Sequence, residues 1–381
     1  MSLSQTGTRA DFLVIGAGIA GASVAYELAG RGARVVILER EGRAGMHATG
    51  RSAAIFSEIY GNGPVRALSR ATRKFLFEPP AGFTDVPLVR PRETLFIAPP
   101  EQVAALRAMR AEADVAAGTQ MMNREAAVRR VPILRPEFVA EAMLEPDAND
   151  IDVNALHEGF LRAARKRGAQ LVTDVAVAAI ERREREWRVR TPAADYAAPV
   201  LINAAGAWVD EVARLAGAKP LGFEPKRRTV VTFDVRPDLK VADWPLVIDA
   251  EETFYFKPDA GRLLLTPADE TPSPPCDAQP EEIDVARAID RFESVTTERV
   301  RRIAAKWAGL RTFAPDRTPV VGFDPRTDGF FWLGGQGGYG MQTSSGMART
   351  AAALASGAEL PADIAAHGVI ASALSPERFG G

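Results

Sequence analysis

One motif near the start of the chain constrains its fold more than any other feature. The apolar run from Asp11 to Ile15 leads into the glycine-rich segment 16–21, and a helical segment follows. A second apolar run, Ala33 to Leu38, ends at Glu39. Strand, glycine turn, helix, strand and an acid about 20 residues after the glycines form the dinucleotide fingerprint. The motif therefore predicts a Rossmann-type βαβ unit that binds an adenine dinucleotide.

Each part of this motif has a physical task. Gly16 permits the tight turn, Gly18 lets the backbone approach a pyrophosphate, and Gly21 lets helix and strand pack closely. The helix N-terminus offers N–H groups to the anion, and Glu39 meets the adenosine ribose. The residues predicted to bind the dinucleotide here are Gly16, Gly18, Ile19, Ala20, Gly21, Glu39 and Arg40.

Composition excludes several classes of partner. A net charge of -2 over 381 residues, without a basic stripe interleaved with aromatics, gives no reason to expect nucleic acid. The lone cysteine, Cys276, excludes an internal disulfide, and three histidines far apart in sequence predict no metal site. The first apolar run is too short for a membrane span. We expect a cytoplasmic protein with no membrane span.

The chain is long enough for two domains, and nucleotide-type elements appear at its start, middle and end. We predict an α/β fold: a Rossmann-type domain built from the discontinuous segments 1–84, 146–222 and 314–381, and a mostly antiparallel α+β substrate domain from 85–145 and 223–313. Periodicity predicts a strand from Leu88 to Ala98 and helices over 101–117, 153–167 and 282–305.

Two further motifs bear on which dinucleotide binds. Residues 201–208 read as an apolar strand that ends in small residues before a helix. A flat ligand could lie against this backbone, or the segment could be only a tight strand-to-helix turn. Residues 334–343 contain five glycines, which we expect to open the last long helix, through about Ala355. Such a positive helix end would stabilise negative charge on a reduced flavin, a need that NAD enzymes do not have.

Taken together, the sequence resembles the FAD-dependent D-amino-acid oxidase and glycine oxidase superfamily, most closely its D-arginine dehydrogenase branch. The matching stretches cover nearly the whole chain: 16–21 with Glu39, 49–54, 203–208, 225–228, 254–258, 307–311 and 336–343. The resemblance implies noncovalent FAD, since Cys276 lies in a proline-rich loop and members with covalent flavin carry a cysteine near it. It adds these cofactor-binding residues: Thr49, Arg51, Ser52, Ala53, Ala54, Val175, Ala205, Gly206, Trp208, Gly337, Gly338, Tyr339, Gly340, Met341 and Gln342.

The resemblance also places Arg311, Arg228, Tyr255 and Tyr60 at the substrate, with Gly338 beside them. The chemistry supports Arg311 independently, because a guanidinium fork reads a planar carboxylate with two charge-assisted hydrogen bonds. A surface role for Arg311 is the alternative, and Arg228 could equally be a second clamp or pair with a nearby acid. Each tyrosine could donate to substrate or be a buried aromatic with a satisfied hydroxyl.

We therefore predict an enzyme that oxidises the C–N bond of a D-amino acid, glycine or an N-alkyl amino acid. Hydride transfer to flavin N5 gives an imino acid that hydrolyses, and reduced flavin passes electrons to oxygen or another acceptor. A 2-hydroxy-acid oxidase of the same fold and a flavin-binding protein with little turnover are the alternatives. Because Thr94 and Ile55 replace the acid and histidine of arginine-acting members, and Glu93 should point away from the pocket, we expect neutral, mainly apolar side chains to be preferred.

Overall fold

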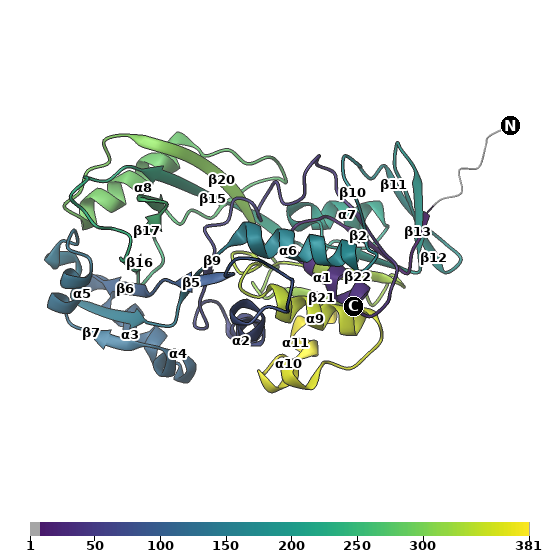
Figure 1. Cartoon of the computed structure of the whole chain (residues 1–381), viewed down its shortest axis with the longest axis horizontal. Helices are drawn as coiled ribbons and strands as arrows, with labels where there is room; N and C mark the ends of the chain where they lie inside the picture. The colour runs from purple at the N-terminus through teal and green to yellow at the C-terminus, as the bar shows by residue number, and fades with distance from the viewer. Residues whose placement is uncertain (1–7, 381) are drawn as a thin grey trace.

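The computed structural model describes residues 8–380, which form two large sheets and the helices that pack on them (Figure 1). The first is a six-stranded sheet, parallel throughout except for its last pair. Its order is β10 (Gln170–Val172), β3 (Val35–Leu38), β2 (Phe12–Ile15), β14 (Val200–Asn203), β22 (Phe330–Gly334) and β21 (Val320–Phe323). The sheet thus joins segments from the start, middle and end of the chain.

Apolar side chains on both faces hold the six-stranded sheet in the core. Alternate residues of a strand point to opposite faces, so a parallel strand covered on both sides reads as a continuous apolar run. In β2, Phe12 and Val14 face α1 (Ile19–Gly30), α6 (Val153–Lys166) and α9 (Ser344–Ala355). Leu13 and Ile15 face the opposite layer, which is a small sheet of β1 (Thr8–Arg9), β13 (Asp195–Ala198), β12 (Glu186–Arg190) and β11 (Ala179–Arg183), together with α7 (Val209–Leu215).

The second large sheet has nine strands and is antiparallel except where β16 pairs with β6. Its order is β19 (Thr271–Pro272), β15 (Glu224–Phe233), β18 (Arg262–Thr266), β17 (Tyr255–Asp259), β16 (Leu246–Asp249), β6 (Thr94–Ala98), β8 (Glu141–Glu145) and β7 (Gln120–Met122), with β20 (Ile303–Phe313) paired to β15. Helix α8 (Glu282–Val295) packs on one face against Leu95 and Ile97, and α3 (Val103–Ala111) packs on the other against Phe96. The expected mixed α/β architecture with a mostly antiparallel second sheet is confirmed.

The remaining elements are short or connect the two sheets. The helix α2 lies near α9, and β4, β9 and β5 form a small sheet of their own. The remaining helices are α2 (Gly63–Phe77), α4 (Ala113–Gly118), α5 (Arg124–Arg130), α10 (Ala362–Ala366) and α11 (Ala371–Leu374). The remaining strands are β4 (Ile55–Phe56), β5 (Val89–Pro91) and β9 (Asn149–Ile151), and single 3₁₀ turns lie at Pro100–Gln102, Pro136–Phe138, Gly206–Trp208 and Pro376–Phe379.

Three predicted elements are wrong in extent. The strand predicted over 88–98 is two strands, β5 and β6, which belong to different sheets. The helix predicted over 101–117 is a 3₁₀ turn followed by α3 and α4. The helix predicted over 282–305 ends at Val295, because Thr297 donates its N–H to the carbonyl of Ile133 and the chain then enters β20.

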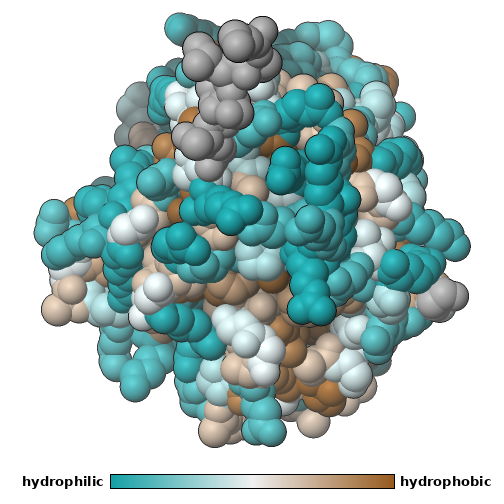
Figure 2. Space-filling view, turned by 90° about the vertical axis from the view of Figure 1, so that its right-hand side faces the viewer, coloured by the Kyte–Doolittle hydropathy of each residue, from teal (hydrophilic) through white to brown (hydrophobic). Residues whose placement is uncertain are grey.

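The predicted domain boundaries stay a prediction, and residues 1–7 and 381 of those segments lie outside the described residues. Within residues 8–380, no helix is long and apolar enough to cross a bilayer. Figure 2 shows that hydrophilic side chains cover most of the face at the right-hand end of Figure 1.

Candidate functional site

The turn between β2 and α1 has the tight geometry that its glycines predict. Gly16 has φ +99°, a conformation that glycine adopts without strain. A Cβ on Gly21 would lie 1.9 Å from the carbonyl oxygen of Gly16, so only glycine lets α1 pack this closely on the turn. The carboxylate of Glu39 accepts the N–H of Ala17 at 2.8 Å. The predicted acid therefore closes the turn from the end of β3.

The side chain of Thr49, in the loop that follows β3, stabilises this turn further. Thr49 Oγ1 accepts the N–H of Ile19 at 3.0 Å, so one N-terminal donor of α1 is satisfied within the protein. A Cβ on Gly18 would lie 3.2 Å from the same hydroxyl. The loop 45–52 thus packs directly against the glycine turn, and residues of both segments would hold the pyrophosphate of a bound dinucleotide.

A long cavity runs from this turn toward the second sheet. The segments that line it include the β2–α1 turn, the end of β3, the loop 45–53, the β14–α7 connection and the end of β20 with the glycine-rich segment. Of the predicted cofactor residues, those that line it are Gly16, Gly18, Ile19, Ala20, Glu39, Arg40, Thr49, Arg51, Ser52, Ala53, Val175, Ala205, Gly206, Trp208, Gly337, Gly338, Gly340 and Met341. Lining residues that the prediction omitted include His47, Ala204, Gly309, Leu310 and Gln336.

The donors at the inner end of this cavity fit a flavin ring system. Within residues 8–380, the N–H groups of Gly338, Gly340 and Met341 have no hydrogen-bond acceptor. The side-chain nitrogen of Gln336 is buried without a partner. A flavin presents carbonyl oxygens and ring nitrogens that can accept from such donors. These unsatisfied groups support the cofactor that the sequence predicts.

The glycine-rich segment does not begin a helix, which corrects our expectation. Helix α9 begins at Ser344, and residues 337–343 form turns in which Gly337 has φ +50°. The predicted helix end at the flavin is therefore wrong, and the N–H groups without acceptors in this segment belong to turns. Tyr339 also differs from the prediction, because its ring packs against Tyr60 and Phe313 and does not line the cavity.

An aromatic and charged wall closes the outer end of the cavity. The indole of Trp208 contacts the guanidinium of Arg40, 4.2 Å from the ring centroid, and the imidazole of His47, 4.7 Å centroid to centroid. Glu41 joins the two neighbours, because it pairs with Arg40 and with His47, each at 2.8 Å. The hydrogen bonds from His47 and Arg40 lower the pKa of Glu41, so the carboxylate stays charged and holds the wall in place.

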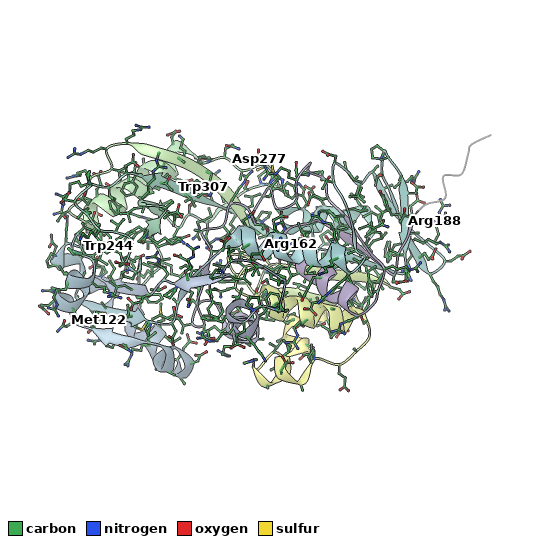
Figure 3. The ribbon with its side chains drawn as sticks, viewed as in Figure 1. Met122, Arg162, Arg188, Trp244, Asp277 and Trp307 are labelled. Carbon is green, nitrogen blue, oxygen red and sulfur yellow. The ribbon has the colours of Figure 1, made fainter. Side chains whose placement is uncertain are left out.

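Arg51 connects the loop 45–53 to β20 and to the segment 277–278. The sequence analysis did not predict this connection. Its guanidinium donates to the carbonyl oxygens of Ala278 and Ala308, each at 2.9 Å, and forms an ion pair with Asp277. Its own carbonyl accepts the indole N–H of Trp307. Figure 3 shows Asp277 and Trp307 on the same side of the molecule, above the junction between the sheets. The Arg51 guanidinium is thus paired with protein groups, although the residue also lines the cavity.

Cys276 lies closer to the cofactor cavity than its proline-rich loop suggested. It lines the cavity together with Ala278 and Leu310. The part of the cavity that Cys276 lines also holds Glu39 and Trp208, and Cys276 is not in the lining of the part that holds Gly338, where the flavin would lie. The position of the thiol therefore does not contradict the argument for noncovalent FAD. Noncovalent binding remains a prediction.

A second cavity of about 80 Å³ adjoins the first, and Arg311 lies at the junction. Six residues line both cavities: Ser52, Ala53, Arg228, Tyr255, Arg311 and Gly338. Tyr60, Ala54 and Gln342 line only the second. The predicted substrate residues are therefore brought together from β15, β17, β20 and two loops.

Arg311 has an incomplete set of partners. Within residues 8–380, no carboxylate oxygen lies within 4.0 Å of its guanidinium, and its one hydrogen-bond acceptor is the hydroxyl of Tyr60 at 3.4 Å. Burial raises the pKa of Tyr60, so this hydroxyl stays protonated and can donate elsewhere. A Cβ on Gly338 would lie 2.8 Å from Cζ of Arg311. The absence of a side chain at Gly338 thus leaves space for the guanidinium fork.

Arg228 has protein partners and also lines both cavities, so its role as a second clamp stays a prediction. Its Nε donates to the carbonyl of Asp269 at 2.9 Å, and Nη2 lies 3.5 Å from Glu270. Burial and then the like charge of Arg311 lower the pKa of Arg228. Its side chain also lines both cavities. The protein anchors one edge of this guanidinium and leaves it beside the unpaired Arg311.

The wall of the second cavity matches the predicted strand orientation. Ile55, Thr94 and Phe96 line it, whereas Glu93 forms an ion pair with Arg130 and lies elsewhere. Ser57, Leu246, Ile248 and Ala268 complete this wall. Alternation along β6 therefore places Thr94 and Phe96 at the cavity, as expected.

Glu252 is the functional candidate that the sequence analysis missed. It lines the second cavity and is exposed there. Burial raises its pKa, against the opposing pull of Arg311 and Arg228. The argument that this pocket holds no carboxylate is therefore wrong. Glu252 occupies a turn with φ +53°, which Asp249 stabilises by accepting from Thr253 and Phe254, and nothing in the local sequence signals its direction.

Proteins of known function and solved structures resemble this chain in sequence and in fold. A rat mitochondrial dimethylglycine dehydrogenase is 24% identical over 265 residues, covering 68% of this chain and 31% of its own length, so the chain spans about a third of that relative. A glycine oxidase from Geobacillus kaustophilus is 26% identical over 343 residues, covering 86% and 88% of the two chains. Its crystal structure has a TM-score of 0.81, with 92% of this chain and 96% of that one covered at 23% identity.

An FAD-bound L-α-glycerophosphate oxidase from Mycoplasma pneumoniae shares the fold, with a TM-score of 0.81 at 18% identity and coverage of 91% and 95%. The D-arginine dehydrogenase branch stays a prediction. The family model described as FAD dependent oxidoreductase, abbreviated DAO, matches residues 11–354, which is most of the chain. The protein therefore belongs to the DAO family of FAD-dependent oxidoreductases.

Proposed function

We propose that the protein oxidises the C–N bond of an amino acid, either a D-amino acid, glycine or an N-alkyl amino acid with a neutral side chain. The observation that carries this proposal is Arg311, a guanidinium without a carboxylate partner at the junction of the two cavities. Arg311 is half-buried, and removing a cation from water without a counter-ion is costly unless a ligand supplies the charge. The carboxylate of an amino acid has the planar geometry that this fork binds.

The shared lining of the two cavities supports a reaction between substrate and cofactor. FAD, when bound, would accept the hydride that leaves the substrate Cα, and this hydride carries both electrons of the oxidation. Arg311, with Arg228 beside it, holds the carboxylate so that Cα faces the cofactor cavity. Tyr255 lines both cavities and limits how far the substrate can move. Orientation of this kind contributes a large part of the rate in such reactions.

Glu252 supplies a group that the reaction can use. An amino acid enters with a charged ammonium group, which must lose a proton before its lone pair can form the C=N bond. Glu252 is a carboxylate in the same cavity and can accept that proton. The resulting imino acid is hydrolysed by water to a keto acid and ammonia. Oxygen or another acceptor then takes the electrons from the reduced cofactor.

The charges of the cavity favour a neutral side chain. Arg228, Arg311 and Glu252 line it, which leaves an excess of one positive charge when all three are ionised. The substrate carboxylate neutralises this excess. A cationic side chain would add a positive charge among apolar residues such as Phe96 and Ile248, which is unfavourable. The relatives named for glycine and dimethylglycine are consistent with neutral amino acids as substrates.

Anaerobic bleaching of the bound flavin tests this proposal. D-alanine is compared with D-lactate, and D-phenylalanine with D-phenyllactate, because each pair differs only in the group on Cα. We expect the amino acids to bleach the flavin and the hydroxy acids to leave it oxidised. Bleaching by the hydroxy acids alone would show C–O oxidation instead, and no bleaching by either would indicate a flavin-binding protein with little turnover.

A further inference from the structure

The second cavity ends in a polar surface that the proposed chemistry does not use. Thr94 is 5% exposed, lines the cavity, and its Oγ1 is buried without a hydrogen-bond partner within residues 8–380. A buried hydroxyl without a partner is unfavourable and uncommon in folded proteins. Valine has the same shape and would avoid the cost. The hydroxyl at this position therefore requires a ligand or another explanation.

Ser57 presents a second hydroxyl to the same cavity. It is 4% exposed, and its Oγ lies 2.9 and 3.0 Å from the two carboxylate oxygens of Glu145. The N–H of Glu58 also donates to Glu145, at 3.2 Å. Because the Ser57 proton points to the acid, the lone pairs of its oxygen are free to accept a hydrogen bond from the cavity.

Glu145 lies behind this surface and has no cationic partner. It is 3% exposed, and within the described chain no lysine or arginine nitrogen lies within 4.0 Å of its carboxylate. Glu145 and Thr94 are directly opposed on the antiparallel strands β8 and β6, so their side chains leave the sheet on the same face. An acid and two hydroxyls therefore meet at one end of an otherwise mainly apolar wall.

We propose that this end of the cavity binds a neutral substrate side chain that carries a hydroxyl or carboxamide group. Thr94 and Ser57 make the hydrogen bonds, and Glu145 is a positioning residue that orients the Ser57 hydroxyl. A hydroxyl or carboxamide can donate to the Ser57 oxygen and exchange a hydrogen bond with Thr94. This inference rests on the proposed function and narrows its substrate class from neutral to hydrogen-bonding side chains, in place of the mainly apolar ones expected from the sequence.

Isosteric substrate pairs test the inference with the holoenzyme. D-threonine is compared with D-valine, and D-asparagine with D-leucine, by kcat/KM. We expect the polar member of at least one pair to be favoured by about tenfold or more, because an apolar side chain leaves the buried hydroxyls unpaired. Preference for the apolar member in both pairs would overturn the inference, and so would faster turnover of D-lysine or D-arginine than of every neutral substrate.

Variants separate recognition from a structural role. Thr94→Val should bring the polar-to-apolar ratio of kcat/KM close to one and raise the melting temperature, because it removes an unpaired buried hydroxyl. Glu145→Gln retains an acceptor for Ser57 and should preserve the ratio, whereas Glu145→Leu should reduce it. An unchanged ratio in Thr94→Val would overturn the proposal, whatever the melting temperature of the variant.

A failure of the proposed function can be told apart from a failure of this inference. If only 2-hydroxy acids bleach the flavin, the same comparison is made with the hydroxy acids that carry these side chains. The melting temperature of Thr94→Val needs no turnover at all. A lower or unchanged value would show that the Thr94 hydroxyl has a partner inside the protein, and the inference would then fail whatever the reaction is.

Discussion

Replacement of Arg311 should separate substrate binding from cofactor binding. The guanidinium lacks a carboxylate partner and hydrogen-bonds only to Tyr60 within the described residues, so an incoming carboxylate would provide most of its pairing. Loss of one partner of a buried, hydrogen-bonded charge pair costs about 2 to 5 kcal/mol. Arg311→Ala should therefore lower kcat/KM by about 30-fold to 4,000-fold, mostly through KM. Arg311→Lys should recover only part of this loss, since a point charge cannot form the fork.

Steady-state kinetics with several carboxylated substrates measure this effect, and flavin absorbance confirms that the cofactor remains bound. Arg317 provides a matched control, because it lies over the ring of Phe313 and is paired with Glu270 at 2.8 Å. Arg317→Ala should lower stability more than it changes KM. The reasoning would be refuted by near-normal KM values in both Arg311 variants, which would place the carboxylate clamp at another residue.

Three further predictions concern the cofactor, the clamp and the buried acid. Acid denaturation should release free FAD into the supernatant, and flavin that precipitates with the chain would instead point to attachment at Cys276. Gly338→Ala should raise KM while FAD stays bound, because the new Cβ would meet Arg311 Cζ at 2.8 Å; unchanged KM would show that the guanidinium has room to move. Burial raises the pKa of Glu145 from its ordinary 4.5 to about 7, which corresponds to about 3 kcal/mol. A raised carboxyl pKa stabilises the fold below pH 4.5, and this contribution is lost as the pH rises to about 7. Glu145→Gln should therefore flatten the fall in melting temperature over that range, and a slope equal to that of the wild type would contradict the raised pKa.

The parts of the fold that the sequence predicted are those governed by local pattern. The turn at Gly16 depends on neighbouring glycines and on Glu39, and both lie within one βαβ unit. Helix α6 shows a clear amphipathic pattern, and the Asp152 side chain caps it by accepting from Ala155. Such signals can be read without knowledge of distant contacts.

The errors arose where distant segments decide the structure. Thr297 leaves the helical path because it hydrogen-bonds to Ile133, far away in sequence. In the glycine-rich segment, Gly337 donates to the carbonyl of Thr312 on β20, which favours turns over a helix. Glu252 reaches the substrate cavity only because the turn between β16 and β17 places it there. None of these contacts has a local sequence signal.

The most direct test of the account is stopped-flow reduction of the bound flavin, without oxygen, by a D-amino acid carrying protium or deuterium on Cα. We propose that the hydrogen on Cα leaves as a hydride while Arg311 holds the carboxylate. Reduction should therefore occur, should be slower with deuterium, and should require higher substrate concentrations in Arg311→Lys. A flavin that stays oxidised with every amino acid but is reduced by 2-hydroxy acids would contradict the account.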